Sequence, residues 1–216
     1  FNAETIDLLL ECYPRKWGYD VPRLDRIGKR IRERRPMYGT KEELTEVVSW
    51  KRVPTGRKFA RENTSGAVKS VSKTAFNKHS DQERIRELTR LAQVGVPMAS
   101  AILRFVWPGS YGTVDWRNWF VLSNVRNRVG KKSNLFGKPL LRSLSSVQRH
   151  SSIGITVERY TRYLRAIRSL AQKHPNRTEK GKELRIVSES IKQHPRRTTA
   201  EIDMALFSYS WGFIVK

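Results

Sequence analysis

The sequence has little of what disulfide-bonded and metal-binding proteins need. It contains one cysteine, Cys12, and four histidines that stand far apart along the chain. A single cysteine excludes an intrachain disulfide framework, an iron–sulfur cluster and a cysteine-rich zinc site, and it is typical of proteins from a reducing compartment. No histidine has a partner at the spacing of a metal-ligand pair. We therefore expect no metal and no cofactor.

Long apolar runs and strand-like alternation are also missing. No stretch of about 18 consecutive apolar residues occurs, so we expect no transmembrane helix, and no signal peptide is recognisable. No segment alternates apolar and polar residues at period two, the pattern of a half-buried strand. Two capping boxes, Thr40 with Glu43 and Ser80 with Glu83, instead mark helix starts.

Apolar residues recur at helical spacing through most of the chain, which predicts an all-α fold. The helices that this pattern predicts cover residues 22–34, 40–51, 64–77, 80–92, 97–107, 115–128, 156–174, 178–193 and 198–211. Asn63 is the expected cap of the helix over 64–77.

Acidic residues are scarce. The chain has 20 Asp and Glu against 43 Lys and Arg, a formal charge of +23. A compact fold with this imbalance repels itself, so a polyanionic partner is the natural explanation. Residues 126–200 alone hold 19 basic and 4 acidic residues. No strongly apolar amphipathic helix favours a membrane. We expect nucleic acid as the partner of a monomeric, cytoplasmic, nucleoid-associated protein. The segment described next favours double-stranded DNA, and an RNA-binding role is an alternative.

The segment "RELTRLAQVGVPMASAILRF", residues 86–105, predicts two helices joined by a short turn. Pro97 suits the first turn of the second helix, where its missing N–H has no partner to lose. Such a turn directs backbone N–H groups and a helix N-terminus outward, which suits a DNA phosphate. The residues that we expect at the DNA backbone are Gln93, Val94, Gly95, Val96, Pro97 and Met98.

A lone carboxylate, Asp115, follows in the segment "TVDWRNW", residues 113–119. It falls at the expected N-cap of the next helix, and a purely structural cap is the simplest interpretation. The aromatic neighbours Trp116 and Trp119 offer stacking surface for a base, and Arg117 offers a phosphate contact. Because of these neighbours, a catalytic role for the Asp115 carboxylate is the second interpretation.

Residues 80–129 resemble the helix-hairpin-helix DNA glycosylase superfamily, which includes endonuclease III and the archaeal 8-oxoguanine glycosylases. The signature of that family is Leu-Pro-Gly-Val-Gly-x-Lys-Thr-Ala, followed by Val-Asp at a helix start. The chain reads Leu-Ala-Gln-Val-Gly-Val-Pro-Met-Ala over residues 91–99, and then Val114-Asp115. Gln93 stands where the family has its first hairpin glycine, and Pro97 stands where bifunctional members have a lysine.

This resemblance implies a monofunctional DNA glycosylase, which flips a damaged or modified base out of the duplex and excises it. Asp115 would stabilise the oxocarbenium-like sugar and activate water. Trp50, Trp116 or Trp119 would stack on the base, and Lys51 is the candidate for a relocated lysine. A non-catalytic helix-hairpin-helix DNA-binding protein is the alternative. The excised base, and repair as opposed to defence against modified phage DNA, stay open.

The resemblance also implies two helical subdomains with a cleft between them. We expect an N-terminal segment over 1–39 that packs with the C-terminal part, a subdomain over 40–130 that carries the hairpin and Asp115, a basic loop over 131–155, and a C-terminal subdomain over 156–216.

Overall fold

The computed structural model describes residues 2–13, 20–115, 117–118, 122, 154–179 and 194–214. Over these residues the chain forms nine α-helices and no β-strand, which confirms the all-α prediction. The helices are α1 (Ala3–Glu11), α3 (Val21–Glu33), α4 (Lys41–Lys51), α5 (Val53–Glu62), α6 (Ser65–Asn77), α7 (Asp81–Leu88), α8 (Val96–Val106), α11 (Val157–Lys173) and α14 (Thr199–Ile214). The basic loop predicted over 131–155 and the helix predicted over 178–193 lie almost wholly outside the described residues, and so does most of the helix predicted over 115–128.

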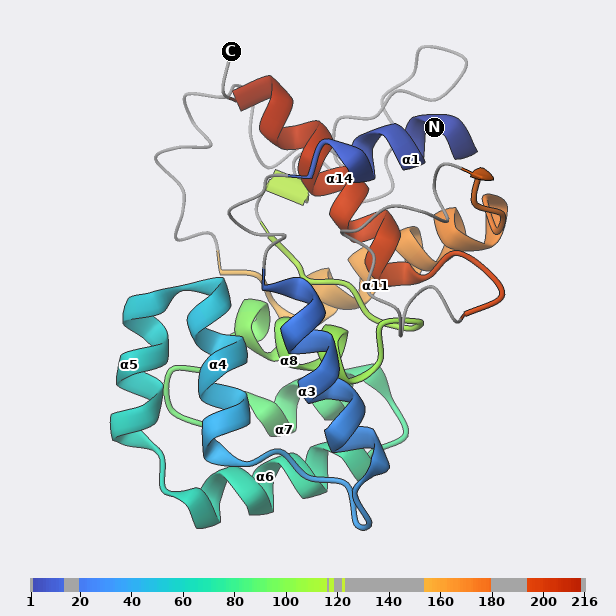
Figure 1. Ribbon diagram of the computed structural model, residues 1–216. Helices are drawn as coiled ribbons and strands as arrows, with labels where there is room; N and C mark the ends of the chain where they lie inside the picture. The colour runs from blue at the N-terminus through green and yellow to red at the C-terminus, as the bar shows by residue number, and fades with distance from the viewer. Residues whose placement is uncertain are drawn as a thin grey trace.

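The described helices gather in two groups (Figure 1). Helices α3 to α8 occupy the lower half of the view, and α1, α11 and α14 occupy the upper half. Helix α14 packs on both α1 and α11, while α8 packs on α3, α4 and α7. The side chains of α8 are buried on every side of the helix, from Ala99 through Val106. Helix α8 is therefore the central helix of the lower group.

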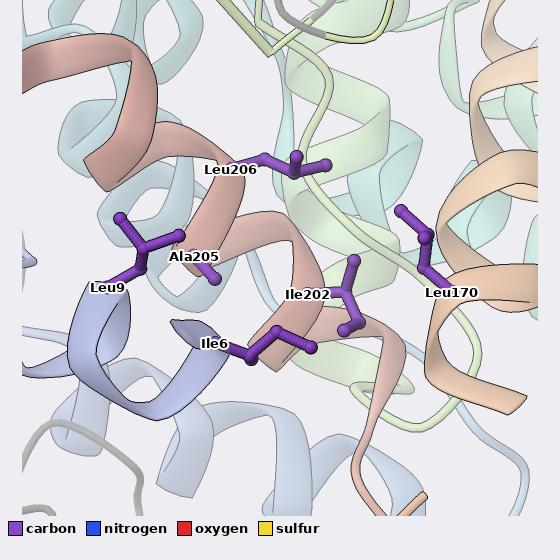
Figure 2. Close-up of a pocket in the computed structure, with 6 residues that line it drawn as sticks. All are labelled: Ile6, Leu9, Leu170, Ile202, Ala205 and Leu206. Atoms are coloured by element: carbon purple, nitrogen blue, oxygen red, sulfur yellow. The ribbon is translucent and has the colours of Figure 1, made fainter. Parts of the chain in front are cut away.

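The upper group is held by an apolar contact among its three helices. Figure 2 shows side chains of α1, α11 and α14 that converge on one small space. They are Ile6, Leu9, Leu170, Ile202, Ala205 and Leu206. The space that they leave is about 10 Å³, so the contact is close-packed.

The two groups are joined by a buried arginine as well as by the chain itself. Arg104 of α8 donates to Asp25 of α3 at 2.5 Å, and both side chains are buried. Arg104 also reaches the sulfur of Met204 on α14 at 3.4 Å. One guanidinium therefore contacts a helix from each group.

Several helix ends follow the sequence prediction. Thr40 and Glu43 form the expected capping box at the start of α4. The Ser80 hydroxyl accepts the Glu83 N–H and caps α7. Pro97 lies in the first turn of α8, as predicted.

Two predictions about helix ends were wrong, and Asn63 explains both. Thr64 caps α6 instead of Asn63, because Asn63 ends α5 and bonds across to the hairpin. The Asn63 side chain accepts the Ala92 N–H at 3.0 Å and donates to the Ala92 carbonyl at 3.1 Å. With both backbone groups of Ala92 taken, the preceding helix ends at Leu88 and not at Ala92.

Helices α1 and α5 were not predicted from the pattern. In α5, Pro54 and Gly56 discourage a helix assignment, but Pro54 sits in the first turn, where proline is tolerated. Gly56 is required by a close approach of α4, because a Cβ there would lie 1.9 Å from the Ser49 hydroxyl oxygen. In the described part of the chain, none of the helices is both long and apolar enough to cross a bilayer.

Gly28 permits a close contact between α3 and α8, and this contact leads to a prediction. A Cβ at Gly28 would lie 1.8 Å from the carbonyl oxygen of Phe105 on α8. Because that neighbour is backbone, α3 and α8 would have to separate, and we expect Gly28→Ala to lower the free energy of unfolding by about 3 kcal/mol or more. Urea denaturation measures this value.

The matched control is Gly66→Ala, on α6, where an added Cβ has nothing within 4 Å. This change should be neutral or stabilising by up to about 1 kcal/mol, because alanine is the better helix former. Equal stability of the two variants would contradict the packing of α3 on α8 described above.

Candidate active site

The site is built on the extended segment that leaves α8 and runs past α11 and α14. Gly112 is needed there, because a Cβ would lie 2.6 Å from Ile167 Cδ1 and 2.8 Å from Asp203 Cβ. The Gly112 carbonyl accepts the hydroxyl of Tyr160 at 3.0 Å. The segment is thus pressed against both helices of the upper group.

The next two backbone N–H groups fix the direction of the segment. Thr113 donates to Asp203 Oδ2 at 2.8 Å, and Val114 donates to Ser100 Oγ at 3.0 Å. These acceptors come from α14 and α8, one from each group of helices. Asp115 follows directly, so its position is set by both groups.

Asp115 is the centre of an ion cluster. Its Oδ1 accepts the backbone N–H of Arg117 at 2.9 Å, a hydrogen bond of the kind expected for the predicted N-cap. The guanidinium of Arg117 lies 3.3 Å from the same oxygen. Its Oδ2 accepts the ammonium of Lys51 at 3.3 Å, and both side chains of this pair are 14% exposed.

The Asp115 carboxyl is held in its ionised form. Burial by itself would raise the pKa of Asp115, but the charge of Lys51, the N–H of Arg117 and the charge of Arg117 together lower it below its ordinary value of 3.8. Asp115 is therefore a carboxylate at neutral pH, and its side chain is still 14% exposed.

Asp115 lines a cavity of about 240 Å³ that lies between α4 and α14. Three aromatic side chains form part of its wall, namely Tyr13, Trp50 and Phe207. Trp50 packs edge-on against Phe105, with ring centroids 5.0 Å apart. Tyr13 and Phe207 lie 5.6 Å apart in a tilted pair. A flat ring that entered this cavity would meet aromatic surface from two directions.

A second carboxylate, Asp203 of α14, lines the same cavity. Its Oδ1 accepts the amide of Asn118 at 2.7 Å and the hydroxyl of Tyr163, and its Oδ2 accepts Thr113 N–H. Complete burial raises the pKa of Asp203 from 3.8 to about 6, although these hydrogen bonds and the charge of Lys51 oppose the shift. The cavity therefore holds two carboxyl groups whose pKa values have moved in opposite directions.

A larger, shallower hollow of about 560 Å³ adjoins the cavity and shares Trp50 and Lys51 with it. The corner between α4 and α5 forms its far side, with Arg52, Val53 and Pro54. Val53 is 55% exposed, which is unusual for a large apolar residue in this protein. Lys51 and Trp50 therefore stand between the cavity and an open surface.

The predicted hairpin lies at the other end of α5. Gln93 adopts φ 66°, the left-handed conformation that favours glycine, at the position where the resembling family has one. Its side chain donates to Glu62, the last residue of α5, at 2.7 Å. Gln93 and Gly95 are exposed, while Val94 and Val96 point inward and are buried. Pro97 and Met98 are half-buried.

Two backbone N–H groups of this turn, those of Gly95 and Val96, have no acceptor within the described residues. A Cβ at Gly95 would meet only Pro97 Cδ, at 3.8 Å. The turn thus presents the N-terminus of α8 on an open surface.

The structure brings Lys51, Trp50, Asp115 and Arg117 to one cavity. The hairpin residues lie outside it, and Trp116 and Trp119 lie outside the described residues. Sequence reasoning missed Tyr13, Asp203 and Phe207. For Asp203 a signal was present, since it is a carboxylate between Ile202 and the apolar run that follows it.

Comparisons with known proteins leave the site to be interpreted from its own geometry. The chain matches no family model, no curated protein and no solved structure.

The raised pKa of Asp203 generates a prediction about stability. The folded protein binds a proton at Asp203 more tightly than the unfolded chain, so this group stabilises the fold most at low pH, and that stability is lost as pH rises from about 3.8 through about 6. Asp203→Asn removes the titration. Relative to the wild type, its free energy of unfolding should rise by up to about 3 kcal/mol between pH 4 and pH 7.

Urea denaturation of both proteins at several pH values measures this difference. Other titrating groups cancel between the two proteins, so the difference reports Asp203. A difference that stays constant over this pH range would show that Asp203 is not buried as described.

Proposed function

We propose that the protein is a DNA glycosylase, which hydrolyses the bond between a damaged or modified base and its sugar in duplex DNA. One observation carries the proposal: an ionised, positioned carboxylate, Asp115, in an aromatic-walled cavity between two groups of helices. The family resemblance implies a cleft between two helical subdomains, and this cavity is our candidate for that cleft.

Hydrolysis of the bond between base and sugar requires a fixed negative charge beside the sugar. Cleavage of a glycosidic bond builds oxocarbenium-like positive charge on the ring, and a preorganised carboxylate stabilises that charge. The same group can accept a proton from the attacking water. Asp115 meets both demands, because Arg117 and Lys51 keep it ionised and the segment from Gly112 keeps it in place.

The cavity also suits a base that has been flipped out of the DNA duplex. An enzyme that acts on a base inside a duplex has to flip that nucleotide out and bind it in a pocket, often between aromatic side chains. Trp50, Tyr13 and Phe207 supply such surface, and a volume of about 240 Å³ admits one flat heterocycle. The hydrogen-bonding groups of Asp203 and Asn118 stand at the same wall.

Helix α5 supplies a route for the DNA backbone between the hairpin and the cavity. Its ten residues span roughly 15 Å, from Val53 beside the cavity mouth to Glu62 beside Gln93. Four exposed cations follow this route, namely Arg52, Arg57, Lys58 and Arg61. A DNA strand covers that length in roughly four nucleotides, so one strand could contact the hairpin and also enter the cavity.

The hairpin supports the proposal through its backbone. Gln93 replaces a glycine in sequence but keeps the left-handed conformation, and Pro97 sits in the first turn of α8. The N–H groups of Gly95 and Val96 have no acceptor within the described residues and belong to a helix N-terminus, where an anion is favoured. A phosphate contact there needs no lysine at position 97.

The first prediction concerns Asp115. Asp115→Asn and Asp115→Ser both keep an N-cap, because these residues cap helices about as well as aspartate does, but they remove the negative charge. We expect excision to fall roughly 100-fold to 1,000-fold, while duplex affinity stays near the wild-type value.

The measurement is single-turnover excision on duplexes that each carry one modified base, and on modified phage genomic DNA. Hot alkali converts every abasic site to a strand break. Breaks in the wild type that both variants lack would also name the base. Tight duplex binding with no excision of any base by the wild type would favour the non-catalytic DNA-binding protein.

The second prediction concerns the hairpin. Gly95→Leu places a side chain over the outward N–H groups without a clash in the fold, because a Cβ there has only one neighbour within 4 Å. We expect the affinity for all duplexes to fall alike, by about tenfold, which is 1.4 kcal/mol. Titration of labelled duplexes at fixed salt measures this.

Gly154→Leu is the matched control, since it lies before α11 and an added Cβ has nothing within 4 Å. It should bind DNA as the wild type does. If both variants bind equally well, the hairpin makes no contact with phosphate.

A further inference from the structure

We infer that the cavity selects bases that carry an amino group next to an unprotonated ring nitrogen, as cytosine and adenine do, over their oxo counterparts uracil and hypoxanthine. The inference rests on the proposed function, because it takes the cavity to be the base pocket, and it goes beyond that function by naming the class of base. Three side chains that line the cavity carry it, namely Thr113, Asn118 and Asp203, and we call them the polar wall.

Two polar atoms of the polar wall have no hydrogen-bond partner. Within the described residues, neither Asn118 Oδ1 nor Thr113 Oγ1 makes a hydrogen bond, although Asn118 is only 1% exposed and Thr113 only 4%. The other amide atom of Asn118, Nδ2, donates to Asp203, so Oδ1 is the atom that is left for a ligand. Because a buried polar group without a partner is unfavourable, a ligand that pairs these atoms is favoured.

The third member, Asp203, keeps one position open on its carboxyl group. Its Oδ1 accepts two side-chain donors, Asn118 and Tyr163, whereas its Oδ2 accepts only the N–H of Thr113 within the described residues. Each carboxyl oxygen can accept two hydrogen bonds, so a second position on Oδ2 is free. A proton on Oδ2 displaces no donor, and Oδ2 is therefore where the protonated acid carries it.

The protonated wall presents a donor beside an acceptor. Asp203 donates from Oδ2, and Asn118, which contacts Asp203 at 2.7 Å, accepts at Oδ1. A flipped base is read along its pairing edge, where cytosine and adenine place an amino donor next to a ring nitrogen that accepts. Both pairs can then form. An oxo counterpart has an N–H and an oxygen at these places, so its oxygen would meet the oxygen of Asn118.

The surroundings of Asp203 make its neutral form accessible. Burial raises the pKa of Asp203 to about 6, and a base in the cavity buries the carboxyl group further, which favours the proton again. The charged and titratable groups around Asp203 are Tyr13, Lys51, Arg104, Asp115, Tyr160 and Tyr163.

The tyrosines and Asp115 do not titrate near pH 6. Burial raises the pKa of each of the three tyrosines above its ordinary value of 10. The pKa of Asp115 is lowered, despite its burial, by the charge of Lys51 and the N–H of Arg117. Among these carboxyl and phenol groups, only Asp203 therefore changes its charge between about pH 5.5 and pH 7.

The test measures the affinity of the full chain for four free bases by titration calorimetry, so it does not depend on excision. At about pH 5.5 we expect cytosine to bind at least about tenfold more tightly than uracil, and adenine than hypoxanthine. From pH 7 to pH 5.5 the affinities for cytosine and adenine should rise roughly eightfold, because protonated Asp203 rises from about one tenth to about three quarters of the protein. The affinities for uracil and hypoxanthine should not rise.

A first variant tests the proton on Asp203. Asp203→Asn cannot titrate, whichever way its amide is turned, so its affinity for cytosine and adenine should be the same at both pH values. Thermal unfolding at both pH values shows that this variant is folded.

A second variant tests the wall without altering its charge. Cytosine also has an oxygen beside its ring nitrogen, and the Thr113 hydroxyl, on the other side of Asp203 from Asn118, can donate to it. Thr113→Val removes a hydroxyl that has no partner, so the fold should persist while the affinity for cytosine falls about threefold to tenfold. Thr45→Val is the matched control, because its hydroxyl also has no partner but lies at the outer hollow, and it should bind cytosine as the wild type does.

Four results would overturn the inference. They are oxo bases that bind as tightly as amino bases, an affinity for cytosine that is the same at both pH values in the wild type, equal affinities of Thr113→Val and Thr45→Val, and no binding of any of the four bases at millimolar concentration. If the wild type excises 5-hydroxymethyluracil in preference to 5-hydroxymethylcytosine, the proposed glycosylase stands and only the preference fails. If the free bases bind in the expected order but no modified base is excised, the base pocket stands and the proposed hydrolysis fails.

Discussion

The arrangement of the candidate site depends on the hydrogen bonds that one buried carboxyl group, that of Asp203, accepts. It accepts the backbone N–H of Thr113, the amide of Asn118 and the hydroxyl of Tyr163. These three donors come from the extended segment, from a position three residues after Asp115 and from α11. One side chain of α14 thus fixes both flanks of Asp115. A buried acid with this many partners is favourable only when the partners are in place, so the network specifies a single arrangement.

The anchoring of α14 extends this constraint to the rest of the upper group. Thr198 and Glu201 form a capping box at the start of α14, and Arg177 clamps Glu201 through two nitrogens, at 2.6 and 2.8 Å. The Ala200 N–H donates to the Pro108 carbonyl. The start of α14 is therefore held against the segment that leaves α8, and Asp203, one turn further along, meets Thr113 in a fixed register.

Two carboxyl groups in one cavity have been given different properties by their surroundings. Cations and a helix N-terminus surround Asp115, and these lower its pKa despite burial. Tyrosine, amide and backbone groups surround Asp203, and its complete burial raises its pKa. Such a separation is how one site keeps one acid charged while another takes up a proton at mildly acidic pH. The charged carboxylate is Asp115, beside Lys51, and the proposed hydrolysis of the bond between base and sugar needs that charge.

The sequence by itself determined the features that depend on neighbours within about four residues. The all-helical pattern, the capping box at Thr40, the N-cap at Ser80, the first-turn position of Pro97 and the hydrogen bond from Arg117 N–H to Asp115 could all be predicted, because each interaction closes within one helical turn. Helix ends were harder, as at Leu88, where the side chain of Asn63 from a different helix competes for the backbone of Ala92.

Only the tertiary structure decided which of these residues meet. Lys51 reaches Asp115 across 64 positions, and Asp203 reaches Thr113 across 90. Tyr13 and Phe207 come from opposite ends of the chain to form one wall of the cavity. Periodicity shows that a helix has a buried face, but it does not show which helix covers that face. That choice is made by how side chains of distant segments pack, as at Gly28 and Gly112, where the absence of a Cβ allows two elements to touch.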